Sequence, residues 1–426
     1  MKRNSKLSPL EKSWILYDIG NSAFILLVST IIPIFFESLC AADGLSNAEY
    51  LSTWSFMGSI STLIVAFIGP VCGAMADCKK CKKRIFVLCM SLGAVGCAVL
   101  GASWSWLSFA VIFVIAKVGY NSANVFYDAM LPEVASAERM DNISSLGYAF
   151  GYIGSVIPFV LCLVVVLGNE LIGISMGTAM AIAFAITALW WIGCTIPLLK
   201  NYKQTAYVES KGNPIVAAFR QLWNTFLEAR KHKHIFMYLL SFFFFIDGVY
   251  TIIEMATAYG TSLGLDTTGL LLALLWTQIV AFPCAIIFGR LAAKHDTGKL
   301  IKLCILCYTG ITLFAVFLMY QWQFWLLATL VGMFQGGIQA LSRSYLGKIV
   351  PPEQSGEYYG LMDICGKGAS FLGMFLVGMV SKYTDGMSFH IFGLQLQSQS
   401  LAVASLVIIF VIGFVLFCKA DKLNRK

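Results

Sequence analysis

The sequence is short of charge, of histidine and of polar stretches long enough to form a soluble domain. Only 12% of its 426 residues are Asp, Glu, Lys or Arg, and it has four histidines. It contains no glycine-rich phosphate-binding motif, which argues against an ATP-driven pump, and no cleavage site for a signal peptide. Hydrophobic residues make up 58%, and the mean hydropathy is +0.78. Because this is far too apolar for a soluble chain, the composition predicts a multi-pass membrane protein.

Apolar runs of about 20 residues, the length that crosses a bilayer as a helix, recur along the whole chain. We expect an all-α membrane protein with twelve transmembrane helices and no large soluble domain. The predicted helices cover residues 14–36, 51–75, 85–102, 106–127, 146–167, 174–199, 235–263, 269–288, 303–320, 324–345, 358–383 and 401–418.

Basic residues are distributed very unevenly between the two sides of the predicted membrane. Of the 30 Lys and Arg residues, 27 fall before the first helix, after the last helix, in loops that follow even-numbered helices or, for Arg343, near the end of such a helix. The positive-inside rule then places both the N- and C-termini in the cytoplasm. The net charge of +8 follows from this topology, so no nucleic-acid partner is expected. The predicted location is the cell (inner) membrane, or the vacuolar membrane if the source is a eukaryote.

The cysteine and serine motifs do not indicate a metal site or a hydrolase active site. The thirteen cysteines resemble small packing residues, and the two CxxC pairs, Cys78 with Cys81 and Cys304 with Cys307, have no histidine beside them. We therefore expect no metal and no cofactor. A GxSxG match at residues 173–177 opens a predicted helix without the strand-turn-helix context of a hydrolase, so no enzyme activity is expected.

Landmarks in the first half of the chain return in the second half. The pairs Pro132-Glu133 and Pro352-Glu353 lie 220 residues apart, and each precedes a glycine-rich helix. Asp18 in the first helix has a counterpart in Asp247 of the seventh, 229 residues later. Repeats of about half the chain are one of the plans found in secondary transporters.

The repeat predicts three regions. Residues 1–199 form an N-terminal six-helix bundle, and residues 235–426 form a C-terminal six-helix bundle with the same topology. Residues 200–234 form a basic cytoplasmic linker, in which apolar residues at helical spacing beside Arg220 and Arg230 predict a surface helix.

Three segments carry a family resemblance: WILYDIGNSAF at residues 14–24, FYDAMLPE at 126–133 and GKGASFLG at 366–373. Through them the chain resembles the major facilitator superfamily over its whole length. Within it, the chain is similar to the vacuolar effluxer-like permeases, the autophagy-related amino-acid effluxers and their bacterial relatives. The resemblance implies two pseudo-symmetric six-helix halves that transport by alternating access, with helices 1, 4, 7 and 10 around a central cavity.

Asp77, followed by a basic cluster, looks like the superfamily's loop motif between helices 2 and 3. The second copy departs from that motif, because Ala293 stands where the Asp would be, and Arg290 or Asp296 is a candidate to replace it. We predict a cytoplasmic gate or latch. Its candidate residues are Asp77, Lys83, Arg84, Asp128, Glu133, Arg343 and Glu353.

Polar side chains inside the predicted helices follow helical spacing, so that they share a face in each helix. Predicted helices 3, 6, 9 and 12 contain no Asp, Glu, Lys or Arg. Ionisable groups within the membrane usually face a bundle interior or a wet cavity. The candidate residues for a substrate or proton pathway are Asp18, Asn21, Lys117, Asn121, Asn124, Asp247, Tyr250, Glu254, Gln335, Gln339, Asp363 and Lys367.

Several of these residues also have simpler interpretations. Asp18 is six residues beyond Lys12 and can be interfacial, and Asp363 with Lys367 has the i,i+4 spacing of a neutralising ion pair. Asp247 and Glu254 share a face of one helix, and either could bind a coupling proton or only form structural hydrogen bonds.

The sequence therefore favours a secondary active transporter of a small hydrophilic solute. The resemblance implies an amino acid or similar metabolite and export, and proton coupling is a further hypothesis. The alternatives are a lipid or lysolipid flippase and a membrane receptor or scaffold that transports nothing. The expected partners are the solute, membrane lipids and, under the coupling hypothesis, protons, with the chain acting as a monomer.

Overall fold

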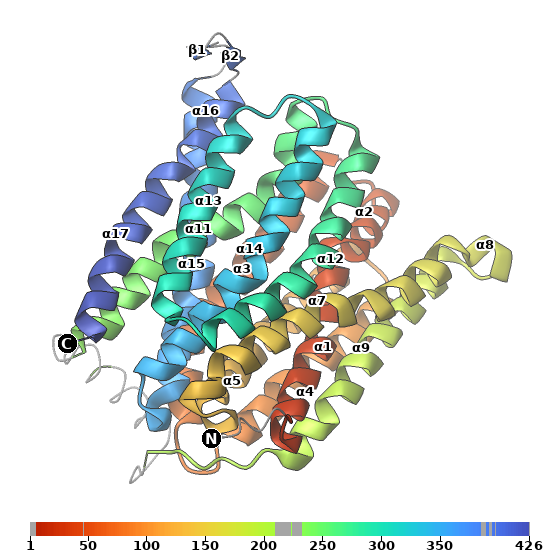
Figure 1. Ribbon diagram of the computed structural model, residues 1–426. Helices are drawn as coiled ribbons and strands as arrows, with labels where there is room; N and C mark the ends of the chain where they lie inside the picture. The colour runs from red at the N-terminus through yellow and green to blue at the C-terminus, as the bar shows by residue number, and fades with distance from the viewer. Residues whose placement is uncertain are drawn as a thin grey trace. The chain divides into compact units, whose positions relative to one another are not determined.

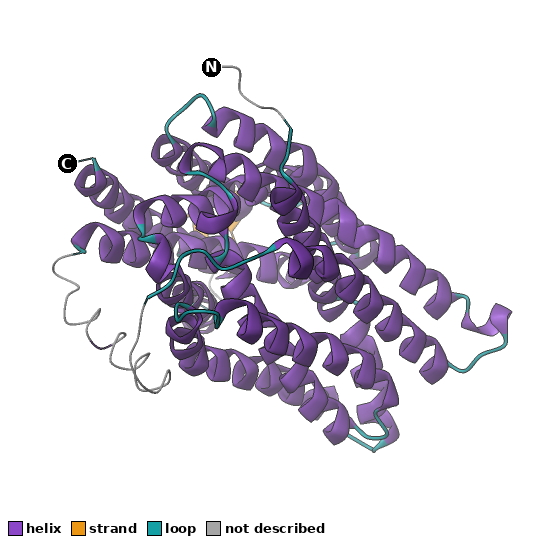
Figure 2. Cartoon of the chain, turned by 90° about the horizontal axis from the view of Figure 1, so that it is seen from below, coloured by secondary structure: helices purple, strands orange, loops and turns teal. Residues whose placement is uncertain are grey.

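The computed structural model describes residues 6–45, 47–208, 223, 232–384, 389–391, 394–396 and 398–425, and these are mostly helical (Figure 1). Figure 2 shows long helices joined mainly by short loops. The long helices are α1 (Pro9–Ser29), α2 (Ile31–Ala42), α3 (Asn47–Ala76), α4 (Lys82–Val99), α5 (Trp106–Ala129), α7 (Ala137–Leu167), α9 (Met176–Asn201), α11 (Lys233–Ser262), α12 (Thr267–Ala292), α13 (Thr297–Val316), α14 (Gln321–Ile349), α15 (Ser355–Tyr383) and α17 (Leu406–Asn424). The short ones are α6 (Leu131–Val134), α8 (Asn169–Ile172), α16 (Ser398–Ala404) and two 3-10 turns, Leu100–Ala102 and Pro352–Gln354.

Each predicted transmembrane segment lies on helical residues of the structure, although the first runs over α1 and α2 and the last over α16 and α17. Among the described residues, nine helices are long and apolar enough to cross a membrane, and the pair α1 and α2 adds a tenth. The predicted segments 51–75 and 358–383 fall on α3 and α15. The protein is thus an all-helical, multi-pass membrane protein, while twelve crossings and cytoplasmic termini stay predictions.

Two local features differ from the predicted pattern. The first predicted span, 14–36, is not one straight helix, because α1 and α2 meet at Thr30 with a bend of 41°. Pro33 explains the break, since it has no N–H to donate to the carbonyl of Ser29. A small antiparallel hairpin, β1 (Phe389–Ile391) with β2 (Leu394–Leu396), precedes α16, and His390 pairs with Gln395 in its register.

The chain divides into two compact units. Unit 1 comprises residues 1–136, 150–222 and 351–360, and unit 2 comprises residues 137–149, 223–350 and 361–426. Two helix starts are exchanged between the units. The first turns of α7 belong to unit 2, and the first turns of α15 belong to unit 1, an exchange that the predicted division did not include.

The helices of the two units pack in matching pairs. In unit 1, α1 packs against α9, α3 against α5, and α4 against both α5 and α9. In unit 2, α11 packs against α17, α12 against α14, and α13 against both α14 and α17. Glycines permit two of these close approaches: a Cβ on Gly20 would lie 2.7 Å from Cys194 Cβ, and one on Gly413 would lie 2.8 Å from Phe245 Cβ. The equivalent pairing supports an internal repeat of six helices.

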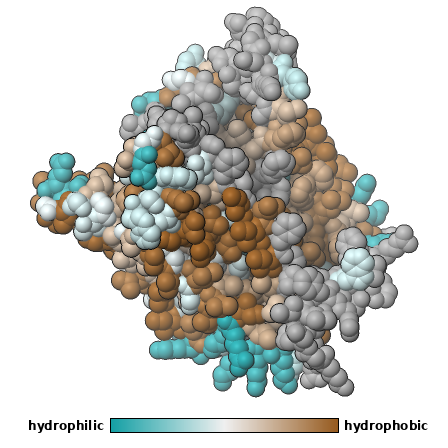
Figure 3. All heavy atoms as spheres, turned by 180° about the vertical axis from the view of Figure 1, so that it is seen from behind, coloured by the Kyte–Doolittle hydropathy of each residue, from teal (hydrophilic) through white to brown (hydrophobic). Residues whose placement is uncertain are grey.

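The outer helices present apolar side chains to their surroundings. Leu88 on α4, Leu189 on α9, Leu306 on α13 and Ile408 on α17 are exposed by 69, 68, 52 and 59%. Hydrophobic residues cover much of the face in Figure 3, with a group of hydrophilic side chains at its lower edge. Large exposed apolar surfaces are stable in lipid and unfavourable in water. These four helices are the ones predicted to carry no ionisable residue within the membrane.

Candidate functional site

An amide pair joins α1 to α5 inside unit 1. Asn21 Nδ2 donates a hydrogen bond to Asn124 Oδ1 at 2.7 Å, and the Tyr17 hydroxyl lies 3.5 Å from the same oxygen. Asn21 and Asp18, one turn earlier on α1, are both buried. Two of the predicted polar faces therefore do meet, and they meet among buried side chains.

Farther along α5, Lys117 and Asn121 continue the same polar face. The Lys117 ammonium lies 5.8 Å from the ring centroid of Phe113, within the range of a weak cation–π contact. Asn121 is buried, and Lys117 is half-buried. Asp128, near the end of α5, is also half-buried. The predicted α5 stripe is therefore half-buried along its length, with Asn121 fully packed.

An aromatic cluster holds the start of α1 against the end of α5. Trp14 stacks on Tyr127 with ring centroids 4.3 Å apart, and its Nε1–H donates to the Tyr127 carbonyl at 3.0 Å. Tyr17 lies 4.6 Å from the Tyr127 ring. All three side chains are fully buried. The family-like segments 14–24 and 126–133 therefore make one packed joint, which orients the face that carries Asp18 and Asn21.

In unit 2, Asp247 of α11 is a fully buried carboxylate. Its Oδ1 accepts hydrogen bonds from the backbone N–H of Gly373 on α15 at 2.9 Å and from the Thr251 hydroxyl at 3.4 Å. Its Oδ2 has no hydrogen-bond partner among the described residues. A Cβ on Gly373 would overlap Thr251 Oγ1, so glycine is needed for this approach.

The other predicted residues of unit 2 are in more varied surroundings. On α11, Tyr250 is half-buried, and Glu254 is exposed although it shares a helix face with Asp247. On α14, Gln335 is buried and Gln339 half-buried. Asp363 on α15 is half-buried. The Lys367 side chain is outside the described residues, and so is the predicted Asp363–Lys367 pair.

Asp77 forms the centre of a buried cluster in unit 1, which we call the α15 clasp. Its Oδ1 accepts from Gly356 N–H at 2.8 Å and its Oδ2 from Glu357 N–H at 2.9 Å, so the carboxylate caps the first turn of α15. Gly73 and Gly356 lie so close that a Cβ on Gly73 would overlap the Gly356 carbonyl oxygen. Burial raises the pKa of Asp77 to about 7, although Lys82 and the two N–H groups lower it.

The cation of the α15 clasp is Lys82, which the sequence-based selection of Lys83 and Arg84 missed. Lys82 is fully buried, with Nζ 2.8 Å from Glu133 Oε1, 3.8 Å from Asp77 Oδ1 and 2.9 Å from Ser355 Oγ. Arg84 is exposed, and within the described ranges the one hydrogen bond that Lys83 donates is to the Tyr202 carbonyl, at 3.4 Å. Position within the first turn of α4 decides which lysine points inward, and a run of basic residues does not reveal it.

Glu133 ties the start of the interhelical linker to the same cluster. It accepts hydrogen bonds from the Tyr202 hydroxyl at 2.8 Å and from the N–H groups of Thr205 at 2.6 Å and Ala206 at 3.1 Å, besides Lys82. Its sequence counterpart Glu353 is exposed. The two Pro-Glu pairs thus repeat in sequence but have different surroundings.

A second buried cluster, the α7 clasp, holds the first turns of α7 within unit 2. Asp141 accepts hydrogen bonds from Ser344 Oγ at 2.6 Å, from Thr297 Oγ1 at 2.7 Å and from Lys348 Nζ. Arg343 donates to the backbone oxygen and the hydroxyl of Ser144, both at 2.9 Å. The Arg343 guanidinium also lies 4.3 Å from the ring centroid of Tyr148.

The α7 clasp corrects the predicted replacement for the acid that is missing near Ala293. Asp296 caps α13 by accepting from Lys299 N–H at 3.0 Å, and it pairs with Arg425 at 2.8 Å. Arg290 is exposed. In unit 2 the buried carboxylate that holds a helix start is Asp141, and it belongs to α7, the helix that is held. Sequence inspection missed it because Asp141 lies in an unremarkable polar stretch, 207 residues from Lys348.

Solved structures with the same arrangement define the class of this protein. The human organic anion transporter MFSD10 (TETRAN) superposes with a TM-score of 0.71 at 15% identity, covering 96% of this chain and 98% of that one. FucP, a major facilitator superfamily transporter in the outward conformation, gives 0.70 at 15% identity, with 97% of both chains covered. The chain therefore has the major facilitator fold of two pseudo-symmetric halves.

Sequence comparison identifies the family. Residues 10–421 match the family described as "Vacuole effluxer Atg22 like", and the chain belongs to it. An uncharacterized MFS-type transporter, YxiO of Bacillus subtilis (strain 168), is 39% identical over 421 residues, which cover 98% of this chain and 95% of the relative. Autophagy-related protein 22 of Kluyveromyces lactis is 21% identical, with 89% of each chain covered. The protein is thus a membrane transporter.

Proposed function

We propose that this transporter moves a small hydrophilic solute, an amino acid or similar metabolite, by alternating access in the direction of efflux. The observation that carries the proposal is the sorting of side chains between helices. Amide and carboxylate groups collect on α1, α5, α11 and α14, whereas α4, α9, α13 and α17 are apolar outside. Polar groups are unfavourable in lipid unless they line a path for a solute or bind one another. The description of the family as vacuole effluxers supports the direction.

Proton coupling is the second part of the proposal and rests on Asp247. Its Oδ2 is buried without a partner among the described residues, while Oδ1 is held by Gly373 and Thr251. In this position a proton on Oδ2 removes a buried charge and leaves the accepted hydrogen bonds in place. Asp247 therefore binds the coupling proton, and the exposed Glu254 is the alternative carrier.

The two clasps form the gate in this proposal. Each clasp fixes the first turns of one helix through several charge-assisted hydrogen bonds. Asp77 and Lys82 hold α15, and Asp141 and Arg343 hold α7. Alternating access requires helix ends to be held in one state and released in another. The buried clasps provide that holding step, and their opening is the event that admits solute.

Counterflow in proteoliposomes with a panel of labelled amino acids tests the function. We expect preloaded unlabelled solute to drive transient accumulation of at least one labelled amino acid, with empty liposomes as the control. Lipid scrambling without counterflow would favour a flippase instead. If neither solute exchange nor lipid scrambling occurs, the result favours a receptor or scaffold and overturns the proposal.

A further inference from the structure

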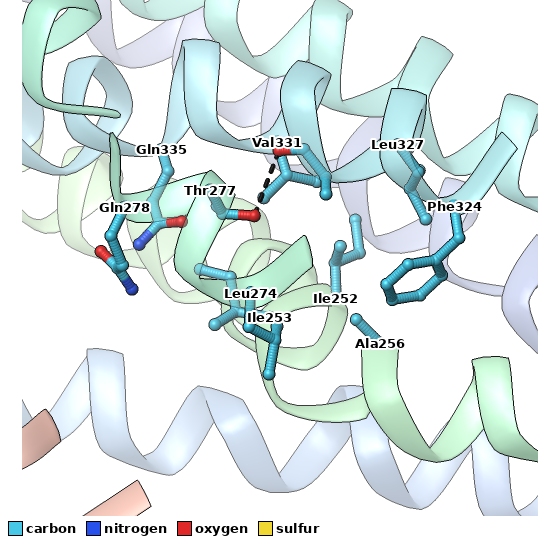
Figure 4. A pocket seen from close by; sticks show the side chains of 11 residues that line it. Ile252, Ile253, Ala256, Leu274, Thr277, Gln278, Phe324, Leu327, Val331 and Gln335 are labelled. Atoms are coloured by element: carbon cyan, nitrogen blue, oxygen red, sulfur yellow. Dashed lines mark hydrogen bonds between the residues drawn. The ribbon is translucent and has the colours of Figure 1, made fainter. Parts of the chain in front are cut away.

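Unit 2 encloses a small space between α11, α12 and α14, with aliphatic side chains around most of it in Figure 4. Its volume is about 50 Å³, which holds a few water molecules but no solute of the proposed class. More extensive polar contacts are found in unit 1, where the start of the linker lies against the α15 clasp.

The first residues of the linker cross the loop between α3 and α4, and we call residues 202–208 the strap. In Figure 1 the strap is the extended yellow-green trace that follows α9. Gln204 fixes its middle, because Nε2 donates to the carbonyls of Ala76 and Cys78, both at 3.1 Å. The Gln204 Oε1 accepts from the backbone N–H of Lys82 at 3.3 Å. One side chain of the strap therefore joins the end of α3 to the start of α4.

Asp77 and Lys82 of the α15 clasp each hold the strap with a second group. The side chain of Asp77 caps α15, while its backbone carbonyl accepts from the Val208 N–H at 2.8 Å. The ammonium of Lys82 contacts Glu133 and Asp77, while its backbone N–H donates to Gln204. Neither residue can move in the clasp without moving a partner of the strap.

Glu133 divides its carboxylate between the clasp and the strap. Its Oε1 accepts from Lys82 Nζ at 2.8 Å, whereas its Oε2 accepts from the N–H groups of Thr205 at 2.6 Å and Ala206 at 3.1 Å. Hydrogen bonds to an ionised carboxylate are shorter and stronger than bonds between neutral groups. Two segments that are remote in sequence, the strap and the first turn of α15, are thus held by the same three residues.

Sets of contacts that share residues are coupled in energy, because the loss of one set alters the geometry of the other. Such coupling is reciprocal, so a strap that stabilises the clasp must also be stabilised by it. The strap is extended, and Lys203 and Thr205 on it are exposed. A segment of this kind depends on its hydrogen bonds and opens readily when they are lost.

We propose that the strap and the first turn of α15 open and close together, with Gln204 as the positioning residue that couples them. The inference rests on the proposed function, in which the α15 clasp is part of the gate. The start of the linker then belongs to the gate, and a movement of the linker reaches α15 through Gln204 and Glu133.

Hydrogen-exchange mass spectrometry on the full chain in detergent measures this coupling. Gln204→Leu removes the bonds to Ala76, Cys78 and Lys82 and leaves the side chains of the clasp unchanged. We expect exchange at residues 351–360 to become at least about threefold faster. Exchange at residues 110–125 of α5 should not change, which excludes a general loss of stability. Lys203→Gln, an exposed position beside Gln204, is the matched control and should change neither segment.

Ser355→Ala tests the coupling in the reverse direction. Ser355 Oγ lies 2.9 Å from Lys82 Nζ and donates to the Ala129 carbonyl at 2.8 Å, so it belongs to the clasp and not to the strap. By reciprocity, exchange at residues 202–208 should become at least about threefold faster. This variant decides the matter if Gln204→Leu does not fold. Faster exchange that stays confined to the strap in Gln204→Leu, or to residues 351–360 in Ser355→Ala, would overturn the inference.

Counterflow separates this inference from the transport proposal. With the labelled amino acid that the panel identifies, Gln204→Leu should raise the exchange rate at saturating solute at least about twofold, because the gate is held less firmly. The half-saturating concentration should stay the same, since solute binding is untouched. If the coupling is measured but no amino acid is exchanged, the transport proposal fails and the coupling stands. If solute is exchanged at an unchanged saturating rate, transport stands and the strap is not part of the gate.

Discussion

Asp77 and Asp247 are both fully buried carboxylates, but their donors give them different tasks. Asp77 has a donor on each oxygen and a lysine beside it, as expected for a structural cap. Among the residues that the structure describes, Asp247 has donors on one oxygen only. Asp247 can therefore take a proton on Oδ2 without losing a hydrogen bond, whereas a change in the ionisation of Asp77 affects the helix end that it caps.

The α15 clasp should respond to pH through Asp77. Its pKa rises from 3.8 to about 7 on folding, through burial and the nearby Glu357 and against the effect of Lys82. The folded protein therefore holds more protons than the unfolded chain between these values, so this group makes stability fall as pH rises through that window. The quantity to compare is the thermal midpoint of the wild type minus that of Asp77→Asn. We expect this difference to decrease as the pH is raised from about 5 to about 7, and to stay constant above that. A difference that stays constant over this range would contradict the assignment.

The contact of Gly373 with Asp247 predicts a position-specific effect of one methyl group. Gly373→Ala should lower the free energy of unfolding by about 1–3 kcal/mol, because its Cβ overlaps Thr251 Oγ1 and meets Asp247 Oδ1 at 2.8 Å. Gly366→Ala on the same helix is the matched control, since its nearest neighbours would be 3.7 Å away. Thermal unfolding in detergent measures both. Equal midpoints for the two variants would rule out the tight approach.

Helices α7 and α15 are distinctive at the scale of elements, because each begins in one compact unit and continues in the other. Their first turns are held by buried acids, Asp141 for α7 and Asp77 for α15. The chemistry of the two clasps is reversed. Asp77 receives the N-terminus of the incoming helix, whereas Asp141 is carried by the incoming helix and receives donors from α13 and α14.

Removing one acid should loosen one helix start and leave the other intact. We expect Asp141→Asn to increase hydrogen exchange at residues 137–149, since the charge-assisted bonds from Lys348, Ser344 and Thr297 are weakened. Protection at residues 351–360 should be unchanged. Asp296→Asn, which removes only an exposed pair with Arg425, is the control and should leave 137–149 protected. Exchange mass spectrometry resolves these segments.

At the scale of the whole molecule, the matching helix pairs of the two units conceal a functional asymmetry. In unit 1, Asn21 of α1 bonds to Asn124 of α5, whereas in unit 2, Asp247 of the equivalent helix α11 bonds to Gly373 of α15. Aligned residues also differ in their surroundings, since Glu133 pairs with Lys82 whereas Glu353 is exposed.

Proton-driven transport should depend on Asp247. In proteoliposomes with an imposed pH gradient, Asp247→Asn should reduce accumulation at least about tenfold while counterflow exchange persists, since a neutral amide mimics the protonated carboxyl but cannot release a proton. Loss in Glu254→Gln rather than in Asp247→Asn would transfer the role to Glu254. Accumulation that survives both substitutions would remove proton coupling from the proposal.

The sequence by itself determined the membrane class, the helical segments, the repeat and the family. Apolar run length and helical periodicity are local properties, so the sequence was sufficient to place Asn21 on a polar face of one helix and Asn124 on a polar face of another. It was also sufficient to predict that the helix carrying Leu88 has no ionisable group within the membrane. The family-like segments were also readable, because their residues are contiguous in the chain.

Only the tertiary structure decided which groups meet. Periodicity shows which side chains share a face, but not which distant helix covers that face. Lys82 rather than Lys83 enters the α15 clasp because of its position in the first turn of α4, and Asp141 finds Lys348 across more than 200 residues of chain. Such contacts depend on packing between remote segments, for which a single sequence contains no local signal.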